Sequence, residues 1–385
     1  MNILFVSNND SKTGAPLYLF SLIKWLVNNT DVRAYISFAS LVRQGQSLHD
    51  EFLKYAKSID PLIEQELQNS SLSIRIIRKL KTIVTGKLTN PYIEFLQDID
   101  LIYVNTFTNG EFLDMILQGR NIPILTHVHE LTHNIGRCNS RRSIQLLLKH
   151  TNEYIAVSNA VSLNLRNSYS IDSEQVRVLN PVIPRVLRVR KSRSQLRSML
   201  GIGQGDFVVL GLGYQHWIKG TDIFFQIALN YVRYLKQDIV FLWVGGNVDD
   251  EYYKMTKTDI EKANMDSHFK VVPHVDNPLD FINASDVLLC TSREDSYPLS
   301  ALEAKSLGKP VCFFKNSGGV EEMFDSLENG VDYLDVRAMT SLILKHHNAT
   351  GDSASTVLTN IDTENESKSH YNNIYQAMSQ TLKMQ

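Results

Sequence analysis

Two carboxylates and a proline in the stretch SREDSYPLSALEAKSLGKPV have the types and spacing for binding phosphate and hydroxyl groups. Pro298 suits the first turn of a helix, so the amides of Leu299 and Ser300 would point outward at its positive end. Asp295 and Glu303 span the loop and about two turns, so both could border one pocket and accept hydrogen bonds from hydroxyls. The alternative is that Asp295 only caps the helix and Glu303 is a solvated acid.

A lysine and several glycines are predicted to lie where strands meet helices. Lys219, in HWIKG, could neutralise charge that develops on a departing diphosphate. Gly14 follows the first strand and Pro16 begins a helix, so a ligand could approach the backbone closely there. Gly245 and Gly246 follow an apolar strand and offer the same access. Alternatively, the lysine is a solvated surface group and each glycine only permits a turn.

Two histidines and an acid end the segment 122–130. His129 and Glu130 follow the apolar run, and His127 lies two residues earlier on the same side of the expected strand. A histidine at the carboxyl end of a parallel strand can hydrogen-bond a ligand, although such a histidine, taken alone, more often has a structural role. The sequence thus contains three candidate groups for a site built at strand ends.

These residues need a scaffold of parallel strands, and the chain has the matching pattern. Short β-branched runs alternate with amphipathic stretches, which is typical of parallel sheets wrapped by helices. In open sheets of this kind, ligands bind beyond the carboxyl ends of the strands. The expected strands are 3–7, 34–39, 101–106, 122–129 and 154–158 in a first domain, and 206–213, 239–246, 269–275, 286–292 and 309–314 in a second.

Composition and charge limit the number of domains and the class of protein. A chain of 385 residues with 43% apolar residues predicts two globular domains. Residues 1–190 carry 21 Lys and Arg against 16 Asp and Glu, and the remainder carries 18 against 25, so the first half suits an anionic partner. The three cysteines are expected to be reduced and buried. No apolar run approaches the length of a membrane span, and nothing indicates nucleic-acid binding.

A linker and an insertion complete the expected organisation. The stretch 180–198 contains two prolines and a basic run, which predicts a linker or hinge. We expect domains at 1–184 and 185–365, a helical insertion at 46–96, and a C-terminal helix at 366–385. Within the insertion, residues 73–87 form a basic amphipathic pattern that indicates either a surface helix or contact with a membrane surface.

Taken together, the motifs resemble the retaining glycosyltransferases of family four. Asp295 and Glu303 match that family's paired acids, and WIKGTDIFF resembles its Lys-Gly donor loop. VSNNDSKTGAPLYLFSL resembles its first glycine loop and THVHEL its His-acid strand end. YIAVSNAV, VLNPV, FLWVGG, NASDVLLCTSRED and SGGVEEM continue in the family's order. The resemblance covers most of the chain outside 46–96.

The resemblance implies an α/β GT-B fold, with two Rossmann-like, doubly wound domains facing across a cleft and the last helix returning to the first domain. It implies a donor nucleotide in the second domain and an acceptor at the first. The implied catalytic residues are His129, Lys219 and Asp295. Thr13, Gly14, Ala15, His129 and Glu130 would lie on the acceptor side. The implied donor-binding residues are Gly14, Lys219, Gly245, His274, Val275, Asp295, Ser296, Tyr297, Pro298, Leu299, Ser300 and Glu303.

The implied reaction moves a sugar from a nucleoside diphosphate to a hydroxyl of a glycan or lipid-linked oligosaccharide with retention, in surface polysaccharide assembly. UDP-sugars are favoured, GDP-mannose is second, and neither metal nor cofactor is expected. The expected location is the cytoplasm, with contact at the inner face of the cytoplasmic membrane as an extension. Alternatives are a binding protein without turnover, a sugar-nucleotide epimerase and a phosphorylase.

Three local patterns need separate treatment. The family often has an arginine at the position of Tyr214, which would pair with Lys219, so part of the usual phosphate clamp is absent or supplied elsewhere. Many members also have Phe-Gly at the positions of Tyr297 and Pro298. The DID at 98–100 resembles a metal motif, but it would lie at the amino end of a strand, away from ligands. GLGYQH has His216 in place of the third glycine of a dinucleotide fingerprint, which argues against a nicotinamide enzyme.

Overall fold

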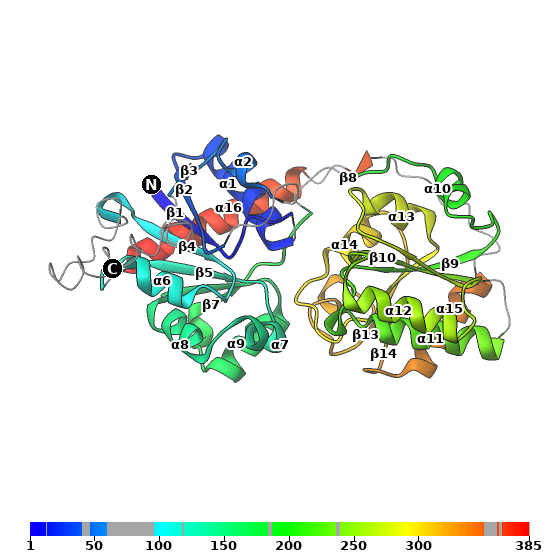
Figure 1. Ribbon diagram of the computed structural model, residues 1–385. Helices are drawn as coiled ribbons and strands as arrows, with labels where there is room; N and C mark the ends of the chain where they lie inside the picture. Colours follow the sequence, from blue (N-terminus) through cyan, green and yellow to red (C-terminus); the bar gives the residue numbers. More distant parts are fainter. Residues whose placement is uncertain are drawn as a thin grey trace, which may run out of the picture. The chain divides into compact units, whose positions relative to one another are not determined.

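In the computed structural model the chain forms two units, each built on a parallel β-sheet (Figure 1). The structure describes residues 1–12, 14–40, 47–59, 96–117, 119–183, 187–235, 239–349, 360–361 and 364–384. The first unit comprises Met1–Val157, Val161–Asn180 and Lys368–Gln385. The second comprises Ser158–Ala160 and Pro181–Ser367. The chain thus changes unit after Asn180, compared with the boundary predicted after residue 184.

The first sheet has the order β3-β2-β1-β4-β5-β6-β7, and all its strands are parallel. The five strands predicted from apolar runs are present, whereas β3 and β7 are too short to leave a periodic pattern. The strands are β1 (Asn2–Ser7), β2 (Arg33–Phe38), β3 (Lys57–Ser58), β4 (Leu101–Asn105), β5 (Ile124–Val128), β6 (Glu153–Ala156) and β7 (Val176–Val178). The helices are α1 (Gly14–Asn29), α2 (His49–Phe52), η1 (Leu96–Asp98), α6 (Gly110–Leu117), α7 (Thr132–Cys138), α8 (Arg141–His150), α9 (Asn159–Tyr169), η2 (Ser173–Gln175), α16 (Glu364–Thr381) and η5 (Leu382–Met384).

The C-terminal helix α16 packs in the core of the first unit, although it is the last helix of the chain (Figure 1). Its apolar residues recur at helical spacing, so one face can be buried. Ile374 and Met378 are fully buried in one cluster with Leu19 and Leu22 of α1. Burial of this face holds α16 on a sheet whose strands lie at the other end of the sequence.

The second sheet has the order β11-β10-β9-β12-β13-β14, again parallel throughout. The five predicted strands are present, and β14 adds two residues at the edge. The strands are β9 (Phe207–Leu212), β10 (Ile239–Val244), β11 (Phe269–Val272), β12 (Val287–Cys290), β13 (Val311–Phe314) and β14 (Gly330–Val331). The helices are α10 (Arg193–Met199), η3 (Trp217–Lys219), α11 (Thr221–Leu235), α12 (Glu251–Lys262), α13 (Pro278–Ala284), α14 (Leu299–Ser306), η4 (Glu321–Met323) and α15 (Val336–Ala349).

Helices cover both faces of the second sheet (Figure 1). One buried cluster joins α13 and α14 to the sheet, and the other joins α11 and α15 to its opposite face. In each sheet the order reverses at the first strand, between β1 and β4 and between β9 and β12. Such switch points leave a crevice at the carboxyl ends of the strands. The fold therefore brings the loops that follow β9 and β12 together.

Residues 193–198, predicted to be part of a linker, instead form helix α10 with Met199. A capping box fixes the start of the helix, because the side chain of Ser192 accepts from the amide of Gln195 and the Gln195 side chain bonds back. The linker prediction is wrong there because a short basic helix with few apolar residues looks like a loop in sequence. Just before α10 in the chain, β8 (Leu187–Arg188) pairs antiparallel with β15 (Asn360–Ile361) in a two-stranded sheet.

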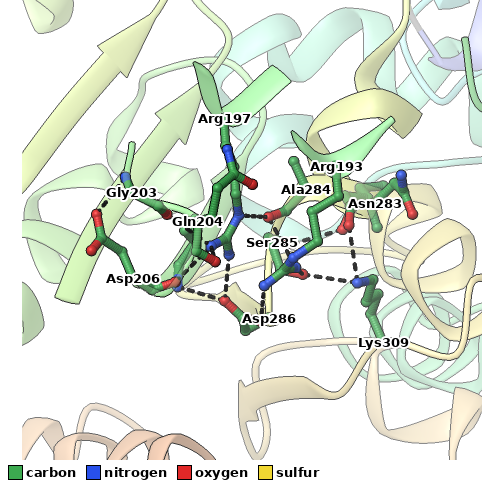
Figure 2. A network of polar contacts seen from close by, with 12 residues as sticks. Arg193, Arg197, Gly203, Gln204, Asp206, Asn283, Ala284, Ser285, Asp286 and Lys309 are labelled. Carbon is green, nitrogen blue, oxygen red and sulfur yellow. Dashed lines mark hydrogen bonds and ion pairs between the residues drawn. The ribbon is translucent and has the colours of Figure 1, made fainter. Parts of the chain in front are cut away.

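The basic residues of α10 bind one carboxylate at the amino end of the second sheet (Figure 2). Arg197 is fully buried, and its Nη2 lies 2.8 Å from Oδ2 of Asp286. Arg193 donates to the other carboxylate oxygen at 2.5 Å. Beside them, the ammonium of Lys309 donates to two backbone carbonyls, and burial lowers its pKa to about 8. The basic run is therefore structural rather than a feature of a mobile hinge.

Several sequence predictions concern peripheral features. Among the cysteines, Cys312 is buried as predicted, but Cys138 is exposed at the end of α7. Asp100 accepts from the amide of Asn2 at 2.7 Å, at the amino end of β4, as expected for a residue without a ligand role. Thr13, most of the predicted insertion and the basic segment 73–87 lie outside the described residues. Over the described parts of the chain, every helix is too short or too polar to cross a bilayer.

Candidate functional site

The second unit pairs Lys219 with Asp295 at the carboxyl end of its sheet. The ammonium of Lys219 lies 2.5 Å from Oδ2 of Asp295, and the hydroxyl of Ser292 donates to the same oxygen at 3.2 Å. Burial disfavours the charge on Lys219, but the adjacent carboxylate outweighs burial and raises the pKa of the lysine. The site therefore holds a fixed positive charge whose partner is an acid that could also bind hydroxyls.

Close backbone contacts hold the two loops together. Gly220, which ends η3, has a φ of +66°, and a Cβ there would lie 2.0 Å from the carbonyl oxygen of Thr291. Gly318 has a φ of +132°, and a Cβ there would lie 2.0 Å from the carbonyl oxygen of Asp295. Only glycine fits both positions, because they combine left-handed φ with no room for a side chain. The loop that bears Asp295 is thus fixed on both sides.

Helix α14 begins directly after this loop. Pro298 is its N-cap rather than its first helical residue, and its carbonyl accepts from the amides of Ala301 and Leu302. Within the described residues, the amides of Leu299 and Ser300 have no hydrogen-bond acceptor, as expected at the start of a helix. The positive end of the helix therefore lies beside Lys219 and Asp295, and such an end favours anions.

A small void of about 10 Å³ is lined by Lys219, Asp295 and Ser300 among other residues. Glu303 is 8% exposed and is not among the residues that line this void. The expected meeting of Lys219 with Asp295 is therefore present, whereas the two acids do not share this void. Glu303 lies one turn into α14, where its backbone carbonyl accepts from the amide of Leu307.

The other predicted donor-binding residues lie on neighbouring loops of the same edge. The amide of His274 donates to the carbonyl of Gly246 at 2.8 Å, which joins the loops after β11 and β10. The amide of Gly245 donates to Val272, the last residue of β11. Val275 and Tyr297 are partly buried against the core under α13 and α14. Ser296 precedes Tyr297 in the loop fixed by Gly318, so these residues surround the carboxyl ends of β10, β11 and β12.

The position where the family often has an arginine holds an exposed tyrosine. Tyr214 is 58% exposed, and a side-chain hydrogen bond to Asp250 raises its pKa. Arg293, in the Asp295 loop, does not replace that arginine, because its guanidinium donates twice to Asp222 and once to the carbonyl of Trp217. It also lies 4.7 Å from the centre of the Trp217 ring. Lys219 is thus the cation that the loop after β9 contributes.

In the first unit, His129 and Glu130 follow β5. The Glu130 carboxylate accepts from the amides of Phe107 and His129, both at 3.1 Å. Burial raises the pKa of Glu130 to about 7, although these two bonds act in the opposite direction. Burial lowers the pKa of His129 to about 3, so its ring is neutral at pH 7. A neutral imidazole and a carboxyl group close to its titration point therefore lie side by side at the strand end.

The glycine loop of the first unit leads into α1. Gly14 begins the helix and is exposed, and a Cβ there would meet nothing within 4 Å, so the space beside it is open. The carbonyl of Ala15 accepts from Nδ2 of Asn105 at 3.1 Å. This hydrogen bond ties the start of α1 to the end of β4, next to β5.

Below His129 lies a buried group of histidines and tyrosines. His127 is fully buried, and its Nδ1 lies 2.5 Å from the Tyr103 hydroxyl. Its ring centre lies 4.2 Å from that of His129. The hydroxyl of Tyr18 on α1 hydrogen-bonds Nε2 of His370 on α16. The C-terminal helix thus contributes a polar side chain to the layer beneath the predicted ligand-binding histidine.

This burial predicts acid sensitivity of the first unit. Burial lowers the pKa of His370 to about 4, so the folded state binds fewer protons than the unfolded state. Stability should therefore fall as pH drops below about 6.5, by ~2 kcal/mol for this group between pH 7 and 5. Hydrogen exchange of the α16 amides at the two pH values measures it. His370→Gln should show a smaller loss, and the exposed His133→Gln should match wild type; equal losses in all three would contradict the assignment.

Two residues near the predicted site were missed from the sequence. Asn105 is the last residue of β4 and is fully buried beside His129. Ser292 binds Asp295 within its own loop. Both follow an apolar strand, so the rule that ligands bind at carboxyl ends could have found them. Their small polar side chains, however, are common in turns and do not single them out.

Parts of this chain are similar in sequence to known proteins. Residues 192–334 match the family model for glycosyl transferases group 1. D-inositol 3-phosphate glycosyltransferase 1 of Catenulispora acidiphila is 23% identical over 248 residues, which are 59% of this chain and 59% of that protein. The alpha-galactosylglucosyldiacylglycerol synthase of Streptococcus pneumoniae is 28% identical over 120 residues, 30% of this chain and 31% of the relative. The chain thus spans about 59% of the length of the first of these relatives.

Solved structures show the same fold over the whole chain. HepE of Anabaena, crystallised with UDP and glucose, matches with a TM-score of 0.72 at 18% identity, covering 100% of this chain and 99% of that one. Because the sequence identity is only 18%, this match shows a shared fold and nothing about activity. The chain therefore has the GT-B-like fold of two Rossmann-like units, and residues 192–334 of its second unit resemble the group 1 glycosyltransferases.

Proposed function

We propose that the chain is a retaining glycosyltransferase that moves a hexose from a nucleoside-diphosphate sugar to a hydroxyl of a glycan or lipid-linked oligosaccharide. The observation that carries this proposal is the Lys219–Asp295 pair beside the amides of Leu299 and Ser300, which have no acceptor among the described residues. A cation and a helix N-terminus suit a diphosphate, and the neighbouring acid suits the hydroxyls of a sugar. Both features lie within the region that matches the group 1 family.

The proposed reaction is a displacement on one face of the sugar. The acceptor oxygen bonds to the anomeric carbon as the bond from that carbon to the diphosphate oxygen breaks. The acceptor proton passes to the departing diphosphate, so the products are a glycoside of unchanged configuration and a nucleoside diphosphate. Lys219 and the amides of Leu299 and Ser300 stabilise the negative charge that develops on the leaving group.

UDP-sugars are the favoured donors and GDP-mannose the second choice. The Anabaena protein with the same fold was crystallised with UDP-glucose as well as with UDP and glucose. Two of the curated relatives are named as an inositol phosphate glycosyltransferase and as a glycolipid synthase, which supports a hydroxyl-bearing acceptor. The basic excess of residues 1–190 suits an anionic acceptor in surface polysaccharide assembly.

We further propose that turnover requires no metal ion. In GT-B chemistry of this kind, the protein's own cation and helix dipole would perform the charge stabilisation that a divalent ion performs elsewhere. Excess EDTA should therefore leave the rate within about twofold. A loss of activity that magnesium or manganese restores would contradict this part of the proposal.

Ligand binding is the first test of the function. UDP or a UDP-sugar at 100 times its dissociation constant should raise the free energy of unfolding by ~2.7 kcal/mol. A thermal-shift panel of UDP, GDP, UDP-glucose, UDP-galactose, UDP-N-acetylglucosamine and GDP-mannose would identify the base and sugar. Adenosine diphosphate serves as the control ligand. If no sugar nucleotide shifts the transition, the proposed function fails.

Turnover separates the two alternatives from the proposal. A binding protein without turnover, which the tyrosine at 214 and the proline at 298 would favour, should bind the donor but release no nucleoside diphosphate. An epimerase should convert the sugar nucleotide without any acceptor. The proposed transferase should release nucleoside diphosphate, and more of it with an oligosaccharide acceptor than with water alone.

A further inference from the structure

The side chains of His129 and Asn105 form a hydrogen bond where two neighbouring strands end. Asn105 is the last residue of β4 and is fully buried, and His129 follows β5. Nε2 of His129 lies 3.1 Å from Oδ1 of Asn105. On the other side, Nδ2 of Asn105 lies 3.1 Å from the carbonyl oxygen of Ala15, in the first turn of α1. One amide thus connects α1, β4 and the predicted ligand-binding histidine.

The chemistry of these groups fixes where the hydrogens lie. A backbone carbonyl can only accept, so the NH₂ group of Asn105 must face Ala15 and its oxygen must face His129. Because that oxygen can only accept, Nε2 of His129 must carry a hydrogen. Burial keeps the pKa of His129 at about 3, so the ring is neutral at pH 7 and has one hydrogen. Nδ1 is therefore left with a bare lone pair.

The surroundings of His129 leave this lone pair for a ligand. Tyr18 of α1 approaches the ring with centres 5.6 Å apart, and His127 lies at 4.2 Å from the same strand. Glu130 is bonded to the backbone amide of His129, not to its ring. In the part of the chain that the structure describes, no group hydrogen-bonds Nδ1, and the His129 side chain is partly exposed. The ring can thus offer an acceptor, but no donor, through Nδ1.

We propose that Asn105 is a positioning residue that fixes His129 in the tautomer with hydrogen on Nε2, so that Nδ1 can accept a hydrogen bond from a ligand hydroxyl at the end of β5. The ligand class rests on the proposed function, whereas the tautomer does not.

The tautomer can be measured on the full chain without any substrate. Long-range ¹H–¹⁵N correlation of histidine-labelled protein reports which ring nitrogen carries hydrogen, and the loss of one spin system in His129→Gln assigns the signal. At pH 7 the wild type should show hydrogen on Nε2 and none on Nδ1. In Asn105→Leu this preference should be lost. A wild-type ring with hydrogen on Nδ1, or an unchanged preference in Asn105→Leu, would overturn the proposal.

An isosteric variant guards against misfolding of the leucine variant. Asn105→Asp places a carboxylate at Nε2, which should raise the pH at which His129 titrates by at least two units. Asn109→Asp makes the same change at a buried position of the same connection and should leave the titration of His129 unchanged. If His129 titrates alike in wild type and Asn105→Asp, the proposal fails.

The two proposals fail separately. If no sugar nucleotide is bound in the thermal-shift panel, the proposed function fails, while the tautomer measurement still decides the role of Asn105.

Discussion

Replacing Lys219 with alanine should lower kcat by about 10²–10³-fold while the protein remains folded. The ammonium lies 2.5 Å from Asp295, between two loops that approach each other closely at Gly220. Arg293 is bound to Asp222 and to the carbonyl of Trp217. Charge on the departing diphosphate would then be stabilised by helix amides alone. Release of nucleoside diphosphate under saturating donor measures the effect.

Two variants make this result specific. Lys219→Arg keeps the charge and should retain more activity than alanine, although the larger planar group fits the Asp295 carboxylate differently. Lys257→Ala removes an exposed lysine on α12 and should leave kcat unchanged. A value of kcat within threefold of wild type in Lys219→Ala would exclude the lysine from catalysis and, with it, the proposed leaving-group site.

Replacing Asp286 with alanine should lower the free energy of unfolding of the second unit by ~3–5 kcal/mol. Its carboxylate neutralises the buried Arg197 at 2.8 Å and also binds Arg193 and the amide of Val208 at the start of β9 (Figure 2). Without it, a fully buried guanidinium would lose the carboxylate to which it is hydrogen-bonded, and Asp206 would act on it only through space. The carbonyls that Arg197 also contacts, those of Ala284 and Asp206 among them, cannot replace a full negative charge.

Urea unfolding followed by circular dichroism measures this loss. Asp266→Ala, at an exposed position of the same unit, should change stability by less than about 0.5 kcal/mol. Combining Asp286→Ala with Arg197→Met should restore part of the loss, because the buried charge is then removed as well. If Asp286→Ala costs less than 1 kcal/mol, the network is not a stabilising element. The variants lie at the amino end of the sheet, so donor binding should survive in the folded fraction.

The sequence predicted the long strands well, but it did not predict the shortest strands or the helix before residue 199. Strands that leave long apolar runs, such as β1 and β10, were located within one or two residues, because burial on both faces demands such runs. Two-residue strands such as β3 and β14 were missed, since so few residues show no periodicity. The basic stretch before residue 199 was taken for a linker, although Arg193 and Arg197 fold into α10 against Asp286, almost 90 residues later. Nothing local marks such a pairing.

The sequence by itself determined the alternation of strands and helices, and therefore the parallel sheets whose carboxyl ends carry Lys219, Asp295 and His129. It could do so because hydrophobic periodicity and the placement of glycine and proline are local properties of the chain. Tertiary structure alone decided which groups meet: Lys219 with Asp295, Asn105 with His129, and His370 with Tyr18 across almost the whole chain. These contacts depend on strand order and helix packing, which join residues that no sequence spacing connects.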